Sequence, residues 1–151
     1  LYRRIKGEVP DEDYTVPIGK SRVIREGNDL TVITYSAMVH IALEAAEILE
    51  GEGISTEILD LRTLMPLDKE GIYNSVKKTS KVIILYETPK TGGIGGEIAA
   101  LISEDMFDYL DGPIIRIGSK DTPVPYSPHM EEFYLPKVDD VVTAAKKLVA
   151  Y

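Results

Sequence analysis

The sequence contains no cysteine and no long uninterrupted apolar run. Without cysteine there is no disulfide framework, no thiolate metal site and no cysteine nucleophile, and a cytoplasmic location is expected. Because a membrane-spanning helix needs about 20 consecutive apolar residues, none is expected here. The composition, 44% hydrophobic and 28% charged over 151 residues, is that of one globular domain.

Basic residues are in deficit, with 17 Lys and Arg against 25 Asp and Glu and a formal net charge of −8. Nucleic-acid-binding proteins need a basic face to displace counterions, so that class of partner is not expected. An acidic surface suits a basic protein partner, although the same charge also serves solubility alone. The sequence predicts no nucleic-acid and no membrane partner.

Histidine is scarce. His40 falls in a predicted helix and His129 in a proline-rich stretch, and neither has a second ligand at the spacing of a zinc site. His129 lies near Glu131 and Glu132, so a small enzyme with a histidine general base is one alternative function. A solvated loop histidine is the simpler interpretation, and no catalytic residue or metal ligand is predicted.

The first residues have neither helical nor strand periodicity. Gly7–Tyr14 combines Pro10 with an acidic cluster, which is typical of an extended linker. Since Leu1 is not an initiator methionine and no signal-peptide core follows it, we interpret residues 1–16 as a linker from an upstream domain. The alternative is a frayed terminus of a complete small protein. Residues 17–151 are predicted to form the domain.

Apolar strand-like segments alternate with amphipathic helical segments along the rest of the chain. Strands are predicted at 21–25, 30–35, 54–61, 81–86 and 114–117. From the strand at 30–35 onward, a helix is predicted between each strand and the next, and a last helix is predicted at 138–151. Strands separated by helices imply right-handed crossovers. The predicted fold is α/β: three α/β/α layers around a mainly parallel sheet of about five strands, with one edge strand free to run antiparallel.

Three local features refine this prediction. Ser36 and Asp68 are predicted to cap the helices that follow them. Phe107 is placed on the inward face of a helix, together with Ile98. Residues 119–137 are rich in proline and are predicted to form an irregular surface loop with a contact role.

Residues 92–96 include four glycines before a predicted helix. Gly93 and Gly95 fit the first two positions of the dinucleotide motif G-x-G-x-x-G, but the third position falls on Ile98. The alternative function is therefore a stand-alone flavodoxin-like module that binds a nucleotide or flavin. We favour glycines that allow a helix or a neighbouring subunit to approach closely.

Several motifs resemble the beta subunit of the decarboxylase component of 2-oxoacid dehydrogenases, which shares its C-terminal domain with transketolase. The run Asp60–Asp68 is the most specific of them. Further motifs occur in the matching order at 16–20, 75–79, 91–93, 97–98, 121–125 and 135–136. The resemblance spans nearly the whole chain.

This resemblance implies a C-terminal domain of a pyruvate- or branched-chain-type enzyme that uses thiamine diphosphate and magnesium. The implied reaction is oxidative decarboxylation of a 2-oxoacid with acyl transfer to a lipoyl group, for which the cofactor supplies the carbanion chemistry. Other domains of the full enzyme hold the cofactor and the metal. No catalytic, cofactor-binding or metal-binding residue is carried over to this chain, and the fragment alone is expected to be inactive.

The resemblance also implies three partners: the alpha subunit, a second beta subunit and the small binding domain of the lipoyl-acyltransferase. The implied beta–beta interface comprises Gly92, Gly93, Gly95, Gly96 and Glu97. The implied acyltransferase site comprises Phe107, Asp111 and Tyr151, where Asp111 and the terminal carboxylate face basic residues. The alternative is that Tyr151 is a disordered tail and Asp111 a simple turn residue.

Overall fold

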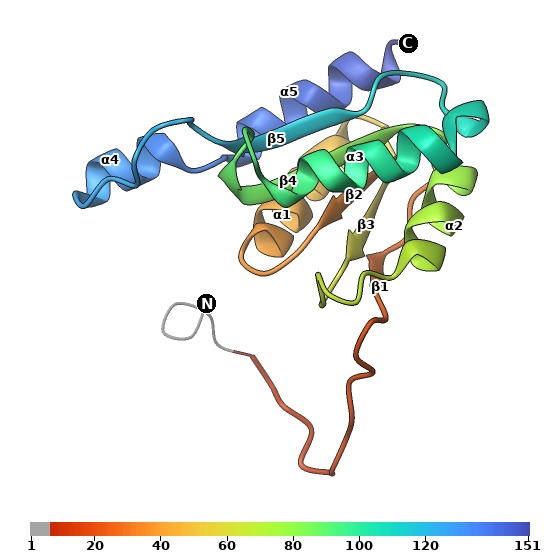
Figure 1. Ribbon diagram of the computed structural model, residues 1–151, viewed down its shortest axis with the longest axis horizontal. Helices are drawn as coiled ribbons and strands as arrows, with labels where there is room; N and C mark the ends of the chain where they lie inside the picture. The colour runs from red at the N-terminus through yellow and green to blue at the C-terminus, as the bar shows by residue number, and fades with distance from the viewer. Residues whose placement is uncertain (1–6) are drawn as a thin grey trace.

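The computed structural model describes residues 7–151, so residues 1–6 of the predicted linker lie outside the described part. Residues 7–20 contain no helix and no strand, and residues 7–18 extend away from the body of the domain (Figure 1). That residues 1–16 link this domain to an upstream domain stays a prediction. No helix within residues 7–151 is long and apolar enough to cross a membrane.

Five strands form one sheet in the order β1-β3-β2-β4-β5. Strands β2 to β5 run parallel to their neighbours, whereas β1 pairs antiparallel with β3 at one edge. This confirms the predicted mainly parallel sheet with an antiparallel edge strand. The strands are β1 (Arg22–Arg25), β2 (Leu30–Thr34), β3 (Thr56–Asp60), β4 (Val82–Pro89) and β5 (Ile115–Ser119).

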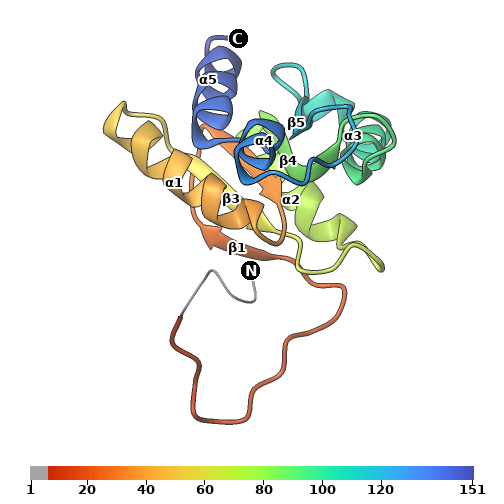
Figure 2. The ribbon, with the colours of Figure 1, turned by 90° about the vertical axis from the view of Figure 1, so that its left-hand side faces the viewer.

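Helices cover both faces of the sheet and complete the three layers (Figure 2). Helices α1 and α5 share one apolar cluster with the sheet, and α2 and α3 share the other. A short helix, α4, and a 3-10 turn, η1, occupy connections. The helices are α1 (Met38–Gly51), α2 (Lys69–Thr79), α3 (Ile94–Asp105), η1 (Phe107–Tyr109), α4 (Pro128–Tyr134) and α5 (Val138–Val149).

Strand β2 shows why the sequence lacks simple alternation in its central strands. All five of its residues are buried. Because successive side chains point to opposite faces, Val32 packs in the cluster of α1 and α5, while Ile33 packs in the cluster of α2 and α3. Both faces are covered, so both sets of positions are apolar or small.

One of the two predicted helix caps is confirmed. The Asp68 carboxylate accepts a hydrogen bond from the Gly71 amide (3.2 Å) and two more from the amide (2.8 Å) and hydroxyl (2.9 Å) of Ser21. The Ser36 cap is wrong. Helix α1 starts after Ala37 without a side-chain cap, because Ser36 adopts a left-handed backbone (φ 59°).

Two further predictions fail locally. Residues 119–137 are not wholly irregular, because α4 starts at Pro128, whose fixed φ suits the first helical turn. Phe107 is not on the inward face of α3. The helix ends at Asp105, Met106 takes the buried position beyond it, and Phe107 is 71% exposed.

Candidate partner-binding site

The chain's C-terminus lies beside the turn that precedes β5. A Cβ atom built on Gly112 would stand 3.1 Å from Leu148 Cδ1 and 3.5 Å from Tyr151 Cβ. The neighbouring residue, Asp111, is exposed, and its amide donates a hydrogen bond to the Ser80 carbonyl (2.9 Å). The fold therefore brings the predicted residues Asp111 and Tyr151 close together and fixes the backbone of the first.

Exposed aromatic side chains flank this turn. Phe107 is 71% exposed and Tyr151 is 68% exposed. A groove of about 470 Å³ lies between α3 and the turn, and Phe107 and Gly112 both line it. Ala99, Ser103, Leu110, Pro113 and Ile114 complete its lining. These lining residues were not predicted, because they come from segments whose proximity depends on the path of η1.

The glycines before α3 are explained first by the fold itself. Tyr86 of β4 is fully buried, and a Cβ on Gly95 would stand 2.1 Å from its Cε1 atom. A Cβ on Gly93 would meet the Pro89 carbonyl oxygen at 2.4 Å. Helix α3 therefore lies directly against β4, which is the close approach of a helix that the sequence suggested.

The remaining predicted interface residues are oriented differently. Gly92 has a left-handed backbone (φ 72°) and is exposed, as is Glu97 in the first turn of α3. Gly96 is half-buried, and the atom nearest to a Cβ built there is Arg116 Nη1 at 3.5 Å. Gly92, Gly96 and Glu97 are thus available to a neighbour, whereas Gly93 and Gly95 serve the interior.

Ligands of open α/β sheets bind where neighbouring crossovers diverge, which here is beyond the carboxyl ends of β2 and β4. The pocket at this point measures about 250 Å³ and is lined by Tyr35, Thr88 and Gly93, among others. Burial raises the pKa of Tyr35, the Glu87 carboxylate acts in the same direction, and a hydrogen bond with Thr88 opposes them. The volume is below the range of about 300–1,000 Å³ typical of small-molecule sites.

A diphosphate and its metal ion would need acidic ligands and a phosphate cradle. Within residues 7–151, no group of three or more His, Cys, Asp or Glu side chains lies close enough to hold a metal. In the glycine loop, the Tyr86 ring occupies the space that a side chain on Gly95 would need, so this glycine serves the packing of α3 on β4. The same observation counts against the flavodoxin-like alternative.

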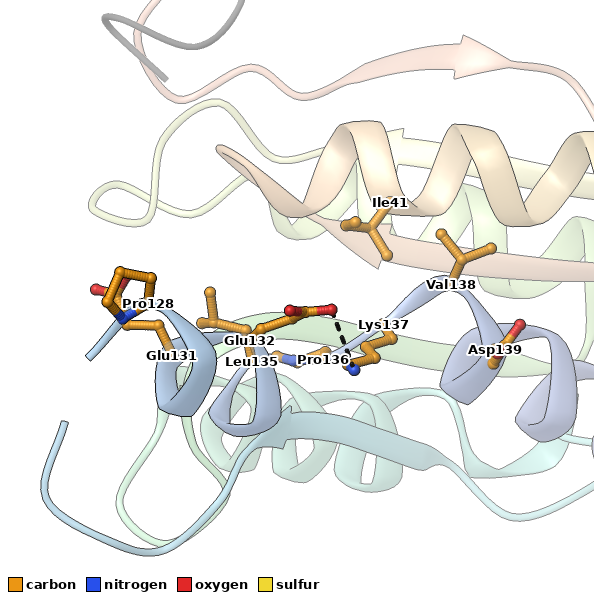
Figure 3. Close-up of a pocket in the computed structure, with 9 residues that line it drawn as sticks. All are labelled: Ile41, Pro128, Glu131, Glu132, Leu135, Pro136, Lys137, Val138 and Asp139. Atoms are coloured by element: carbon orange, nitrogen blue, oxygen red, sulfur yellow. Dashed lines mark ion pairs between the residues drawn. The ribbon is translucent and has the colours of Figure 1, made fainter. Parts of the chain in front are cut away.

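His129 does not join the two neighbouring glutamates in a site. Glu131 and Glu132 line a pocket of about 500 Å³ beside α4, and His129 is not among its lining residues (Figure 3). Glu132 forms an ion pair with Lys137 (Oε1 to Nζ, 3.8 Å). The arrangement does not support a small enzyme that uses His129 as a general base.

A buried charged cluster between β3 and α2 was not predicted. Glu57 of β3 is 1% exposed and forms an ion pair with Lys78 of α2 (Oε2 to Nζ, 2.6 Å). The hydroxyl of Thr31 donates to the second Glu57 oxygen (3.2 Å), and Lys78 also pairs with Glu26. The cluster connects β2, β3 and α2, and Glu26, Glu57 and Lys78 also line a pocket of about 320 Å³.

The layered fold and these surfaces define a three-layer α/β domain whose exposed features suit protein partners better than a small substrate. Residues 19–141 match the transketolase C-terminal domain family, and the chain belongs to this family.

Individual relatives agree with this assignment. The chain is 50% identical over 151 residues to the 2-oxoisovalerate dehydrogenase subunit beta of Bacillus subtilis, covering 99% of this chain and 46% of that one. It is 46% identical to the mitochondrial pyruvate dehydrogenase E1 component subunit beta-2 of Oryza sativa, and this match covers 95% of this chain and 38% of that one. The chain thus spans less than half the length of these curated relatives.

A solved structure supports the fold. A split gene transketolase, described as an inactive beta4 tetramer, superposes with a TM-score of 0.79 at 31% sequence identity. The match covers 95% of this chain and 46% of that chain. A transketolase from Pichia stipitis has the same fold, with a TM-score of 0.55 at 16% identity over 87% of this chain and 18% of that one.

Proposed function

We propose that this chain is the C-terminal assembly and docking domain of the beta subunit of a thiamine-diphosphate-dependent 2-oxoacid dehydrogenase. The observation that carries the proposal is the 50% identity to a subunit beta over essentially the whole chain. The full enzyme decarboxylates a 2-oxoacid oxidatively and transfers the acyl group to a lipoyl group. We place the enzyme in the cytoplasm.

The reacting groups are proposed to lie elsewhere in the full enzyme. Thiamine diphosphate and magnesium are proposed to be held by other domains. The relatives named for 2-oxoisovalerate and for pyruvate support a 2-oxoacid as the substrate class. The domain contributes contacts with an alpha subunit, a second beta subunit and the acyltransferase.

The acyltransferase is proposed to dock on the surface formed by Phe107, Asp111 and Tyr151. Asp111 and the terminal carboxylate are proposed as the two negative groups, because Gly112, next to Asp111, lies against Tyr151. An arginine of the partner can bind both carboxylates, with each charge-assisted bond contributing about 1.5–3 kcal/mol before desolvation. Phe107 supplies an apolar contact beside the groove.

The test is a titration of the acyltransferase's small binding domain into this protein at low salt. Deleting Tyr151 or introducing Asp111→Ala should weaken binding by about tenfold or more, since the deletion moves the terminal carboxylate back by one residue and the substitution removes the Asp111 carboxylate. Asp108→Ala is the matched control, because Asp108 is exposed in η1 and lies outside the proposed bridge. Unchanged affinity in both test variants, with unchanged melting temperature, would refute the docking site.

A second beta subunit is proposed to contact the loop before α3 through Gly92, Gly96 and Glu97, which are accessible. Gly93 and Gly95 hold that loop in place from within. Gly96→Val is the informative variant, because the nearest atom to its Cβ is the end of a flexible arginine. It should weaken self-association in sedimentation equilibrium while leaving the unfolding transition unchanged; unaltered self-association would reject this interface.

A further inference from the structure

Basic side chains gather along the edge of β5, although the protein carries a net charge of −8. β5 is the last strand of the sheet, so one row of its backbone groups has no partner strand among the described residues. A groove of about 450 Å³ follows this edge. Four cationic residues line it: Lys90, Arg116, Lys120 and Lys137.

The groove has two basic walls. On the α3 side, Arg116 Nη1 donates a hydrogen bond to the Lys90 carbonyl (3.2 Å). On the α4 side, Lys120 Nζ lies 5.3 Å from the centre of the Phe133 ring, and the Lys120 amide donates to the Tyr134 carbonyl (3.3 Å). Both walls are therefore anchored to the domain, which makes the groove suited to an extended acidic segment.

One acidic residue also lines the groove, but it is already engaged. The Asp140 carboxylate accepts a hydrogen bond from the Lys137 amide (2.8 Å) at the start of α5. Lys137 also pairs weakly with Glu132 (3.8 Å). Lys90 and Lys120 are exposed and Arg116 is half-buried, and none of the three is paired with a carboxylate among the described residues.

The chain itself contains a segment of complementary chemistry. Residues 8–18 are exposed along their whole length and contain no helix or strand. Glu8, Asp11, Glu12 and Asp13 make its first part acidic. In an extended conformation, Asp11 and Asp13 point to one side.

The other side of this segment is apolar. Tyr14, Val16 and Ile18 follow at alternate positions and are 60%, 51% and 79% exposed. Such a pattern is that of a half-buried strand, yet no strand partner covers it within the described part of the chain. In the groove, Ile115 and Ile117 of β5 are only partly buried.

The segment and the groove of one molecule lie at opposite edges of the sheet. The segment leads into β1, the strand at the far edge from β5. In both ribbon views it leaves the body on the β1 side, away from β5 and α4 (Figures 1 and 2). The groove is therefore presented to another molecule.

We propose that two copies of this chain exchange their acidic segments, so that residues 8–18 of each lie along the β5 edge of the other. Asp11 and Asp13 face the lysines and Arg116, while the apolar side lies against the isoleucines of β5. Addition of a strand to an open sheet edge combines backbone hydrogen bonds with side-chain recognition. The exchange is reciprocal, so each dimer forms the contact twice.

This inference deepens the proposed beta–beta contact, because Arg116 lies against Gly96 of the proposed interface. Two charge-reversed proteins test it. The segment variant carries Asp11→Lys and Asp13→Lys, and the groove variant carries Lys90→Glu and Lys120→Glu. Sedimentation equilibrium at low salt should show self-association weakened by about tenfold or more in each protein alone, because like charges then face each other.

An equimolar mixture of the two variants should associate again, since each reversed segment then meets a groove of opposite charge. The matched control is Glu44→Lys with Glu47→Lys, which makes the same charge change on the exposed side of α1 and should leave self-association unchanged. If the mixture self-associates no more strongly than either variant alone, the proposed segment exchange is wrong. If Gly96→Val dissociates the protein while both reversals do not, the beta–beta contact stands and the segment exchange fails.

Discussion

The Tyr86 ring fills the space that any side chain on Gly95 would need. A Cβ on Gly95 would stand 2.1 Å from Tyr86 Cε1 and 2.5 Å from its Cζ atom. Tyr86 is fully buried in the cluster beneath α2 and α3, so its ring has no free space into which it could rotate. The separation of α3 from β4 is thus set by the absence of a side chain at one position.

We therefore expect Gly95→Val to lower the free energy of unfolding by about 3 kcal/mol, because overpacking must displace either the ring or the helix. Urea denaturation measures the change. Gly96→Val, one residue further along α3, serves as the control and should change stability by less than about 1 kcal/mol. Equal losses of unfolding free energy in the two variants would show that the Tyr86 ring can move aside at little cost.

Parts of this arrangement were predictable from sequence and parts were not. The apolar run of β4 and the glycines after it indicate a strand followed by a close helix, because both are local patterns. That Tyr86 is the residue under Gly95 depends on strand register and on the rotation of α3, which no local pattern fixes. The failed Ser36 cap is similar, since no local pattern indicates the left-handed backbone that Ser36 adopts.

The candidate partner-binding site could also be predicted only in part. Asp111 before Gly112-Pro113 could be recognised as a turn residue, and the resemblance singled it out together with Tyr151. The groove beside Phe107 could not be predicted from the sequence. It depends on the end of α3 at Asp105 and on the turn η1, which places Phe107 on the outside. Glu57 is recognisable in the sequence as an acidic residue next to the apolar pair Ile58 and Leu59, but its partner Lys78 lies on a different element.

The Glu57–Lys78 pair leads to a stability prediction. Lys78→Met should destabilise the fold by about 3 kcal/mol, because it leaves a carboxylate that is 1% exposed without its cation. Adding Glu57→Gln to that variant should recover part of the loss, since the uncompensated charge is then gone. Denaturant unfolding of the two single variants and the double variant gives the coupling energy. Additive effects would mean that the two side chains do not interact.

The isolated chain should not bind thiamine diphosphate. A cofactor site assembled between domains loses its pre-organised groups when the other domains are absent, and residues 7–151 contain no cluster of three or more metal-ligating side chains. Isothermal titration of thiamine diphosphate with magnesium present should give no saturable heat. Saturable binding at micromolar concentrations would contradict the proposed division of labour between domains.

Asp68 links the edge strand to α2 and should make stability depend on pH. Burial alone would raise the pKa of this carboxyl, but hydrogen bonds from the amide and hydroxyl of Ser21 and from the Gly71 amide, with the nearby Lys20 ammonium, leave the pKa below its ordinary value. A carboxyl with a lower pKa in the folded state stabilises the fold at every pH above its unfolded value of about 3.9, and this stabilisation is lost as the pH falls through the folded pKa.

Asp68→Asn should therefore lower the free energy of unfolding by about 1–2 kcal/mol at neutral pH, because the amide keeps one acceptor but loses the charge-assisted bonds. The difference from the unsubstituted protein should stay constant down to about pH 4 and shrink below it, as Asp68 becomes protonated in the reference protein. Urea unfolding across this range provides the measurement, with Asp108→Asn as an exposed control. A difference that persists undiminished into strong acid would show that the Asp68 charge does not contribute and that its hydrogen bonds act equally well when the carboxyl is neutral.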